Sequence, residues 1–338
     1  MVVEMHASEV NREREPEAGA LPEIEGDTRN REPGHHRWGP LIVGSGLAAA
    51  TIAVFKMGFP ALIVAPLLFA WIRIRYGTVG SLSALGLSVV VAAGLGSLEG
   101  GVAALTWGAT GTLLAWGHVK RWRPSGVMGL SAVPLVLLSA LQATVLIRPD
   151  ARAVFLSELG AAIDETARLP NFLGSRPEDL EAAKHLVLGV GEVLWLVTPA
   201  MGFISAAILS FTLYRVAQWL FPKFGIDVRP VAPFGRWAVG ERFIWLVAVG
   251  LVLEVSRVPS AMAAGHNLLL IAGFAYMVQG ASVLRHLLET RRVSKTGQVL
   301  VWVVGFLFLQ PMSSVLAVAA GILDTWFDFR ARLGTHRV

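Results

Sequence analysis

Cysteine is absent from the chain's 338 residues, and charged residues are scarce. The first absence excludes disulfides, thiolate nucleophiles and cysteine-ligated metals or clusters. Charged residues make up 16% of the chain, compared with about 25% in ordinary soluble domains, whereas hydrophobic residues make up 54%. This balance is typical of a protein that exposes apolar surface to lipid.

The motifs that define several common enzyme classes are also missing. The chain has no HExxH, GxSxG or Walker A sequence, so zinc proteolysis, esterase chemistry and ATP hydrolysis lack their usual signatures. We therefore predict that the chain is not an enzyme, and we expect neither a cofactor nor a metal site.

Long apolar runs fill the chain from Trp38 to Trp326, separated by short groups of Arg, Lys, Pro or Gly. The run Val127–Ile147 contains no charge, and a helix of about 20 residues spans the roughly 30 Å of a hydrocarbon layer. We predict an all-α, polytopic integral membrane helix bundle with eight or nine transmembrane helices. The expected spans are residues 39–56, 59–72, 78–95, 99–117, 126–147, 186–220, 243–256, 267–285 and 298–325.

Basic residues are concentrated in alternate loops. With the amino terminus in the cytoplasm, the basic loops at 73–75, 120–123, 223–242 and 285–295 all lie inside. Because cytoplasmic loops carry an excess of Lys and Arg, we predict a cytoplasmic (inner) membrane protein with this orientation. Nucleic acid is not an expected partner, since no soluble domain combines these charges with base-stacking aromatic residues.

The ends of the chain and one long loop differ from the apolar runs. Residues 1–38 hold five Arg and nine Asp or Glu, which predicts a disordered acidic cytoplasmic tail. Residues 39–333 form the expected transmembrane domain, and 334–338 a short carboxy-terminal tail. The loop 148–184 is predicted to be extracytoplasmic and helical, with an amphipathic helix at 150–168 on the membrane surface or over the mouth of the bundle.

The last apolar run allows two topologies. Gln310 and Pro311 interrupt its middle, and proline removes a backbone hydrogen bond. A single kinked helix would place the carboxy terminus outside, whereas a broken or re-entrant pair of half-helices would return it to the cytoplasm. We favour the broken pair, because Arg330, Arg332 and Arg337 follow it.

Polar residues inside the later runs are candidates for ligand binding. They are Glu192, Asn267, Tyr276 and Gln279, and burying such groups in a membrane is costly. Interhelical hydrogen bonding is the alternative for the uncharged ones, and an interfacial position the alternative for Glu192. Glu254 and Arg257 are three residues apart and are expected to neutralise one another.

The carboxy-terminal sequence Gly321-Ile-Leu-Asp-Thr-Trp-Phe-Asp-Phe-Arg330 is also distinctive. On a continuous helix, Asp324 and Asp328 would share one face and Trp326 and Arg330 another. A cation–π contact between Trp326 and Arg330 is expected to anchor this helix end at the interface.

Four short motifs carry a resemblance to a known family: Phe234-Gly-Arg-Trp237, Asn267, Tyr276-Met-Val-Gln-Gly280 and the stretch containing Asp324, Trp326, Asp328 and Arg330. Over residues 39–333 the chain resembles the YybS-like family of predicted bacterial membrane proteins, a domain of unknown function. That family is distantly similar to the substrate-binding S components of energy-coupling-factor transporters and to rod-shape proteins of the MreD type.

The resemblance implies two hypotheses. The likeness to S components implies a small-molecule binding or transport subunit that lacks its own ATPase and docks on a transmembrane coupling protein with ATPases. The docking stripe would then be Gly46, Ala49, Ala50 and Ala53 in the first helix. The likeness to MreD implies instead a membrane scaffold or cell-envelope assembly protein that acts through protein partners.

Overall fold

The computed structural model describes residues 59–95, 98–146, 150–167, 177–308, 310 and 312–334. Within these ranges the chain is helical and contains no strand. The predicted tail at 1–38, the first span at 39–56 with its stripe Gly46, Ala49, Ala50 and Ala53, and residues 335–338 lie outside the described residues.

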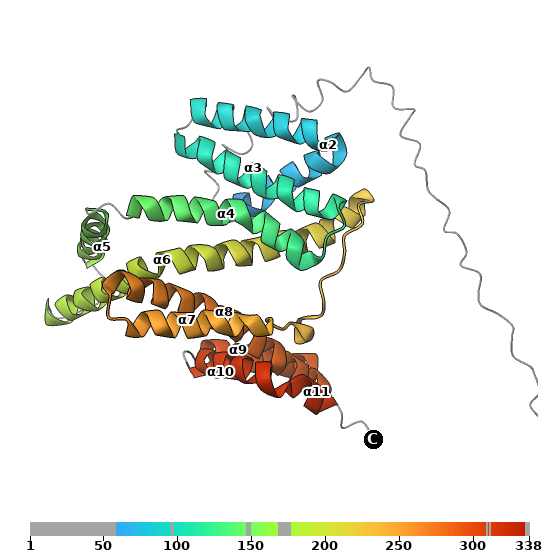
Figure 1. Cartoon of the computed structure of the whole chain (residues 1–338). Coiled ribbons are helices and arrows are strands. Elements are labelled where there is room, and N and C mark those ends of the chain that lie inside the picture. Colours follow the sequence, from blue (N-terminus) through green and yellow to red (C-terminus); the bar gives the residue numbers. More distant parts are fainter. Residues whose placement is uncertain are drawn as a thin grey trace, which may run out of the picture. The chain divides into compact units, whose positions relative to one another are not determined.

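Ten α-helices and three 3-10 turns make up the described part of the chain (Figure 1). In chain order they are α2 (Phe59–Leu95), α3 (Leu98–Val119), α4 (Pro124–Leu146), α5 (Ala151–Ala167), α6 (Pro177–Leu220), η1 (Phe221–Phe224), η2 (Phe234–Arg236), η3 (Glu241–Phe243), α7 (Ile244–Val255), α8 (Pro259–Thr290), α9 (Lys295–Leu307), α10 (Met312–Phe327) and α11 (Phe329–Gly334).

Helix α2 contains two of the expected spans in one element. Gly77 interrupts it with φ 74° and ψ −168°, a conformation that glycine adopts without the steric penalty of a Cβ atom. The interruption falls between the predicted segments 59–72 and 78–95, directly after Arg73 and Arg75. The sequence therefore located this turn correctly, and the helical stretches are longer than expected.

Neighbouring helices pack in a chain of contacts, α2 on α3, α3 on α4, α4 on α6 and α6 on α8, while α8 also packs against α7 and α10. Glycines mark the closest approaches. A Cβ atom on Gly111 of α3 would lie 1.9 Å from the carbonyl oxygen of Pro66 in α2. Small residues that let helix backbones touch are typical of membrane bundles.

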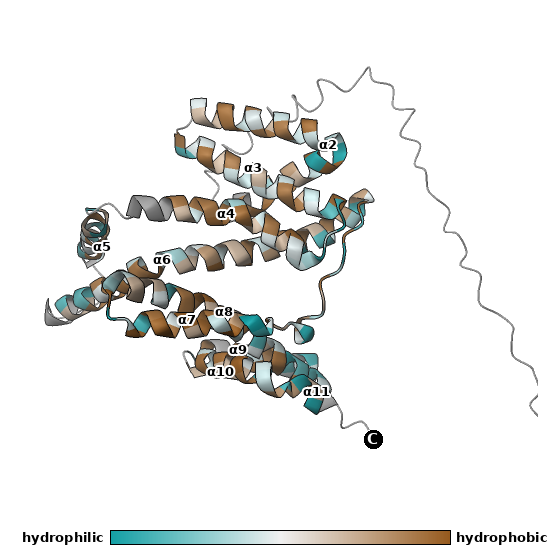
Figure 2. Cartoon of the chain, viewed as in Figure 1, coloured by the Kyte–Doolittle hydropathy of each residue, from teal (hydrophilic) through white to brown (hydrophobic). Residues whose placement is uncertain are grey.

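Four of the described helices are long and apolar enough to cross a membrane. The spans are Leu62–Gly94, Pro124–Leu141, Glu181–Phe224 and Pro259–Thr290. Hydrophobic residues recur along these helices (Figure 2), and only 17% to 33% of each apolar window is buried inside the protein. Such a surface requires a lipid environment. The predicted count of eight or nine spans is not confirmed. Helix α3 is not among the four spans, α7, α9 and α10 have only 12, 13 and 16 residues, and the first expected span lies outside the described residues.

The last apolar run forms two separate helices, α9 and α10. At the start of α9, Gln298 Oε1 accepts a hydrogen bond from Arg285 near the end of α8. After α10, Arg330 donates to the carbonyl oxygen of Trp237, which also accepts from Ser282 of α8. Because both contacts involve the same end of α8, the chain returns after α10 to the end where α9 began. The pair is therefore broken, as favoured above, and not one kinked helix.

Helix α5 covers the residues that were expected to form a helix in the loop 148–184. Two ion pairs join it to α6, Arg152 to Glu192 and Lys184 to Asp164, each at 2.7 Å. The ring centroids of Phe155 and Trp195 lie 5.5 Å apart. Helix α6 begins at Pro177 and has 44 residues. The last part of the predicted loop 148–184 therefore belongs to α6, which is longer than the predicted span 186–220.

Candidate functional site

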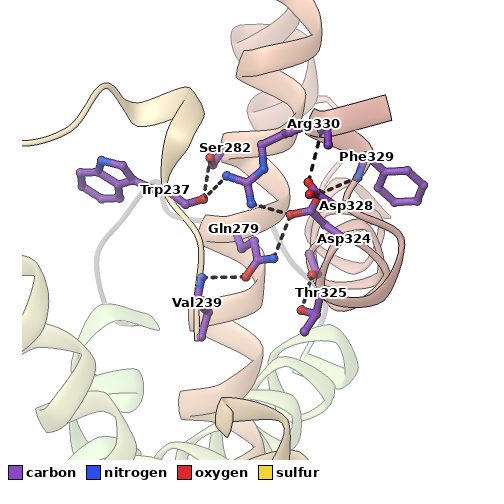
Figure 3. Close-up of polar contacts among 11 residues, drawn as sticks. Trp237, Val239, Gln279, Ser282, Asp324, Thr325, Asp328, Phe329 and Arg330 are labelled. Carbon is purple, nitrogen blue, oxygen red and sulfur yellow. Dashed lines mark hydrogen bonds and ion pairs between the residues drawn. The ribbon is translucent and has the colours of Figure 1, made fainter. Parts of the chain in front are cut away.

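A buried ion pair lies where α8, α10 and α11 meet (Figure 3). The side chain of Asp324 in α10 is 2% exposed and that of Arg330 in α11 is 14% exposed, and Arg330 Nη2 donates to Asp324 Oδ2. Gln279 of α8 donates to the same oxygen at 3.0 Å. A buried charge is tolerated when it is paired and hydrogen-bonded, and both conditions are met here.

The same cluster holds the segment between α6 and α7. The carbonyl oxygen of Trp237 accepts from Arg330 Nη1 at 2.7 Å and from Ser282 Oγ at 2.9 Å. The backbone N–H of Val239 donates to Gln279 Oε1 at 2.9 Å. Three side chains from α8 and α11 therefore fix the backbone of residues 237–240, an irregular stretch between the turns η2 and η3. We call Trp237, Gln279, Ser282, Asp324 and Arg330 the α8–α10 polar cluster.

Asp324 also shapes the corner between α10 and α11. Helix α10 ends at Phe327, and Asp328 has a positive φ of 41°. Phe329 donates its backbone N–H to Asp324 Oδ1 at 3.1 Å, and Ala331 donates to Asp328 Oδ1 at 3.3 Å. Both carboxylates thus accept from N–H groups at the start of α11, as capping residues do.

This corner corrects the expected arrangement of the terminal motif. Because the helix ends before Asp328, Asp324 and Asp328 do not share a face of one continuous helix, and Arg330 turns back toward Asp324 and Trp237. Trp326 is 62% exposed. Among the described residues the cation–π contacts are those of Lys223 with Trp219 and of Arg332 with Phe327, so the predicted pairing of Trp326 with Arg330 is wrong.

Asn267 connects α8 to the middle of α6, beside Pro199. Its Oδ1 accepts from the backbone N–H of Ala200 at 2.8 Å, and its Nδ2 donates to the carbonyl oxygen of Leu196 at 2.9 Å. In a regular helix those two backbone groups would bond to each other. Pro199 has no N–H to donate in this turn, and the Asn267 amide adds hydrogen bonds to the backbone groups beside it.

The remaining polar candidates lie in separate places. Glu192 is 53% exposed and pairs with Arg152, whereas Tyr276 is fully buried with its ring 6.1 Å from that of Phe243. Glu254 lies 3.2 Å from His266 Nδ1 of α8 and not, as expected, against Arg257. Arg257 follows the end of α7 with a positive φ of 58°, which takes it off the helix face that it would have shared with Glu254.

The four predicted ligand residues therefore do not converge on one site. Tyr276 and Gln279 lie beside α10, Asn267 lies against α6, and Glu192 lies against α5. Interhelical hydrogen bonding, the alternative considered from the sequence, describes Asn267 and Gln279. Ligand binding by any of the four remains a prediction.

A large apolar groove, which the sequence did not indicate, lies beside the α8–α10 polar cluster. Its volume is about 1570 Å³, and α4, α6, η2, α8, α9 and α10 contribute to its walls. The residues that line it include no charged side chain, and their polar members apart from Trp237 and Trp302 are Ser210, Gln310, Ser313 and Ser314. Trp237 belongs to both features: its carbonyl oxygen is held by the cluster and the residue lines the groove.

These features define a helical integral membrane protein with a buried polar cluster and an apolar groove among its later helices. Residues 44–325 match the family model described as "Predicted membrane protein (DUF2232)", and the chain belongs to that family. No curated protein and no solved structure matches the chain. The match confirms the expected relation to a membrane family of unknown function, while the likeness to S components and to MreD-type proteins stays a prediction.

Proposed function

We propose that this protein is a cytoplasmic membrane subunit that binds or transports a small molecule and has neither its own ATPase nor an enzymatic activity. The observation that carries the proposal is the apolar groove of about 1570 Å³. Binding sites for small molecules are concave, mostly apolar and provided with a few polar groups. The groove has this composition, with Ser210, Gln310, Ser313 and Ser314 as its small polar residues.

The position of the polar cluster supports a binding role for the groove. Arg330 and Ser282 hold the carbonyl oxygen of Trp237, and Trp237 together with Phe234 lines the groove. A wall that is fixed by hydrogen bonds needs no reordering when a ligand binds, which lowers the entropic cost of binding. In this proposal the terminal motif, including Asp324 and Arg330, positions the wall without touching the ligand.

The proposal includes the orientation and the partners that the sequence predicts. The amino terminus lies in the cytoplasm, the bundle has eight or nine spans, and the lipid bilayer surrounds it. A transmembrane coupling protein with ATPases would supply energy for transport, docking on the stripe Gly46, Ala49, Ala50 and Ala53. Basic loops next to the apolar runs support the orientation.

Native mass spectrometry of the full chain in mild detergent tests the binding role. The variant Gly305→Phe places a ring in the groove, where an added Cβ meets no atom within 4 Å. Gly273→Phe is the matched control, because a Cβ there also meets nothing and the residue does not line the groove. We expect a small molecule to be retained by the wild type and the control but lost from Gly305→Phe. Equal spectra for all three proteins, with no retained molecule, would refute the proposal.

A membrane scaffold or cell-envelope assembly protein is the alternative. It is favoured by α5 and the first turns of α6, which are fastened together by Arg152–Glu192 and Lys184–Asp164 and present a surface for protein partners. In this case, deletion of residues 150–168 or of the acidic tail 1–38 should change protein localisation or cell shape without changing uptake. Unaltered growth, shape and co-purifying proteins after both deletions would exclude the alternative.

A further inference from the structure

We propose that the occupant of the groove is an elongated, uncharged lipid, with a long hydrocarbon or isoprenoid chain that carries a carbonyl or hydroxyl group. This inference rests on the proposed binding function and adds the chemical class of the ligand. It is argued from the size of the groove, the absence of charge in its lining and the uncharged polar residues where α9 gives way to α10.

The size of the groove exceeds what a compact metabolite needs. Pockets for drug-sized ligands measure about 300–1,000 Å³, whereas this groove measures about 1570 Å³ and draws its walls from five α-helices and the η2 turn. Phe203, Phe274 and Leu300 are among the large apolar residues along it. A long flexible chain matches a groove of this volume and composition, because its methylene groups can make van der Waals contacts with the apolar side chains along the whole groove.

The absence of charge in the lining argues against an ionised head group. Arg285, which follows the lining residue Leu284, is bonded to Glu289 and Gln298. Arg330 is bonded to Asp324 and to the carbonyl oxygen of Trp237. Both of these arginines thus already have partners, and an anionic or cationic group inside the groove would lack a counter-charge among the lining residues.

Ser210 is the most enclosed of the polar residues along the groove. The residue lines the groove but is 1% exposed, and its hydroxyl oxygen, which has no hydrogen-bond partner, is enclosed by the protein. A ligand in the groove does not reach that oxygen, so polar contacts to the ligand come from other lining residues.

A group of uncharged polar residues that a ligand can reach lies where α9 gives way to α10. Gln310, Ser313 and Ser314 line the groove, and Ser314 Oγ donates to Gln310 Oε1 at 3.0 Å. Helix α9 is about 20 Å long, from 13 residues at about 1.5 Å each, so this turn lies within the depth of a bilayer whose hydrocarbon core is about 30 Å thick. Amides and hydroxyl groups at this depth suit a neutral hydrogen-bonding ligand.

Photoaffinity labelling of the full chain in lipid nanodiscs tests the ligand class. Three probes share one diazirine-bearing long chain and end in an alcohol, a carboxylate or a trimethylammonium group. We expect the alcohol to label peptides from α4, α6, α8 or α10 most strongly, and an excess of unlabelled long-chain alcohol to compete. Labelling should fall at least about ten-fold in Gly129→Phe, which fills the groove from α4 at a position where a Cβ meets nothing within 4 Å, and stay unchanged in Gly273→Phe.

Serine variants test the polar contacts. Ser314→Ala should weaken competition by the alcohol by roughly five-fold, which corresponds to one lost hydrogen bond. Ser210→Ala should leave competition unchanged, because the Ser210 hydroxyl oxygen is enclosed by the protein. A matched long-chain alkane should compete equally with the wild type and both variants. Ser139→Ala, whose hydroxyl group bonds to its own helix at Leu135, is the control and should change nothing.

The possible results separate this inference from the proposed function. If the carboxylate or ammonium probe labels the groove as strongly as the alcohol, the neutral class is wrong and binding in the groove stands. If Ser314→Ala binds the alcohol as the wild type does, the hydrogen-bonding part of the inference is wrong. A third result would contradict both the inference and the proposed function. In that case Gly129→Phe does not abolish the labelling by any probe, and native mass spectrometry finds no retained molecule.

Discussion

At the residue scale, the ion pair between Asp324 and Arg330 differs from the other pairs in its burial. Its side chains are 2% and 14% exposed, whereas those of Arg152 and Glu192 are 56% and 53% exposed. Removing one partner of a buried pair leaves an uncompensated charge, at a typical cost of 3–5 kcal/mol. Exposed pairs contribute about 0–1 kcal/mol.

We therefore expect Arg330→Met to lower the free energy of unfolding by about 3 kcal/mol, because it leaves the Asp324 carboxylate buried and unpaired. Arg152→Met is the matched control and should cost less than about 1 kcal/mol. Unfolding of the detergent-solubilised chain by titrated denaturing detergent measures both. Similar losses for the two variants would show that the α8–α10 polar cluster does not depend on the buried pair.

The sequence predicted the residue types of this cluster better than its geometry. Gln279, Asp324 and Arg330 were all singled out, but their partners include the carbonyl oxygen of Trp237 and the N–H of Val239. Backbone groups in an irregular loop leave no signature in sequence, since every residue type carries them. The positive φ of Asp328 also could not be foreseen from a run of residues that fits a continuous helix.

At the element scale, the crossing of α8 and α10 depends on two glycines. A Cβ on Gly280 would lie 1.8 Å from the carbonyl oxygen of Ala317, and a Cβ on Gly321 would lie 2.0 Å from that of Tyr276. No side-chain rotation relieves a contact with backbone, so the helices must separate. That movement would pull Asp324 away from Gln279.

We expect Gly280→Ala and Gly321→Ala each to lower stability by roughly 1–3 kcal/mol, the usual cost of overpacking. Gly273→Ala in the same helix should have little effect, because a Cβ there meets nothing within 4 Å. Thermal unfolding in detergent provides the comparison. Unchanged stability in both crossing variants would mean that α8 and α10 are not in backbone contact.

Most element boundaries followed from local features of the sequence. The basic residues Arg73 and Arg75 and the Gln310–Pro311 interruption marked where apolar runs turn. The role of Asn267 was not accessible in the same way, because its partners are backbone groups of Leu196 and Ala200, about 70 residues distant in sequence. The groove was also not foreseeable, since its lining residues belong to six separated elements.

At the scale of the whole molecule, the return of the chain after α10 predicts that the carboxy-terminal end lies on the same side of the membrane as the start of α9. Because the chain has no cysteine, single cysteines can be introduced without background labelling. Lys295→Cys and Ala331→Cys should react with a membrane-impermeant maleimide only after cells are permeabilised, whereas Glu158→Cys in α5 should react in intact cells. Labelling of Ala331→Cys in intact cells would place the carboxy terminus outside and contradict the proposed orientation.

The central claim is that a small molecule occupies the apolar groove. The most direct test counts the small molecules that each chain retains. The double variant Gly129→Phe/Gly305→Phe fills the groove from two walls, and Gly273→Phe is the control. Native mass spectrometry should find a retained molecule on the wild type and on Gly273→Phe and none on the double variant. Retention by the folded double variant equal to that of the wild type would show that the molecule binds elsewhere and would contradict the account.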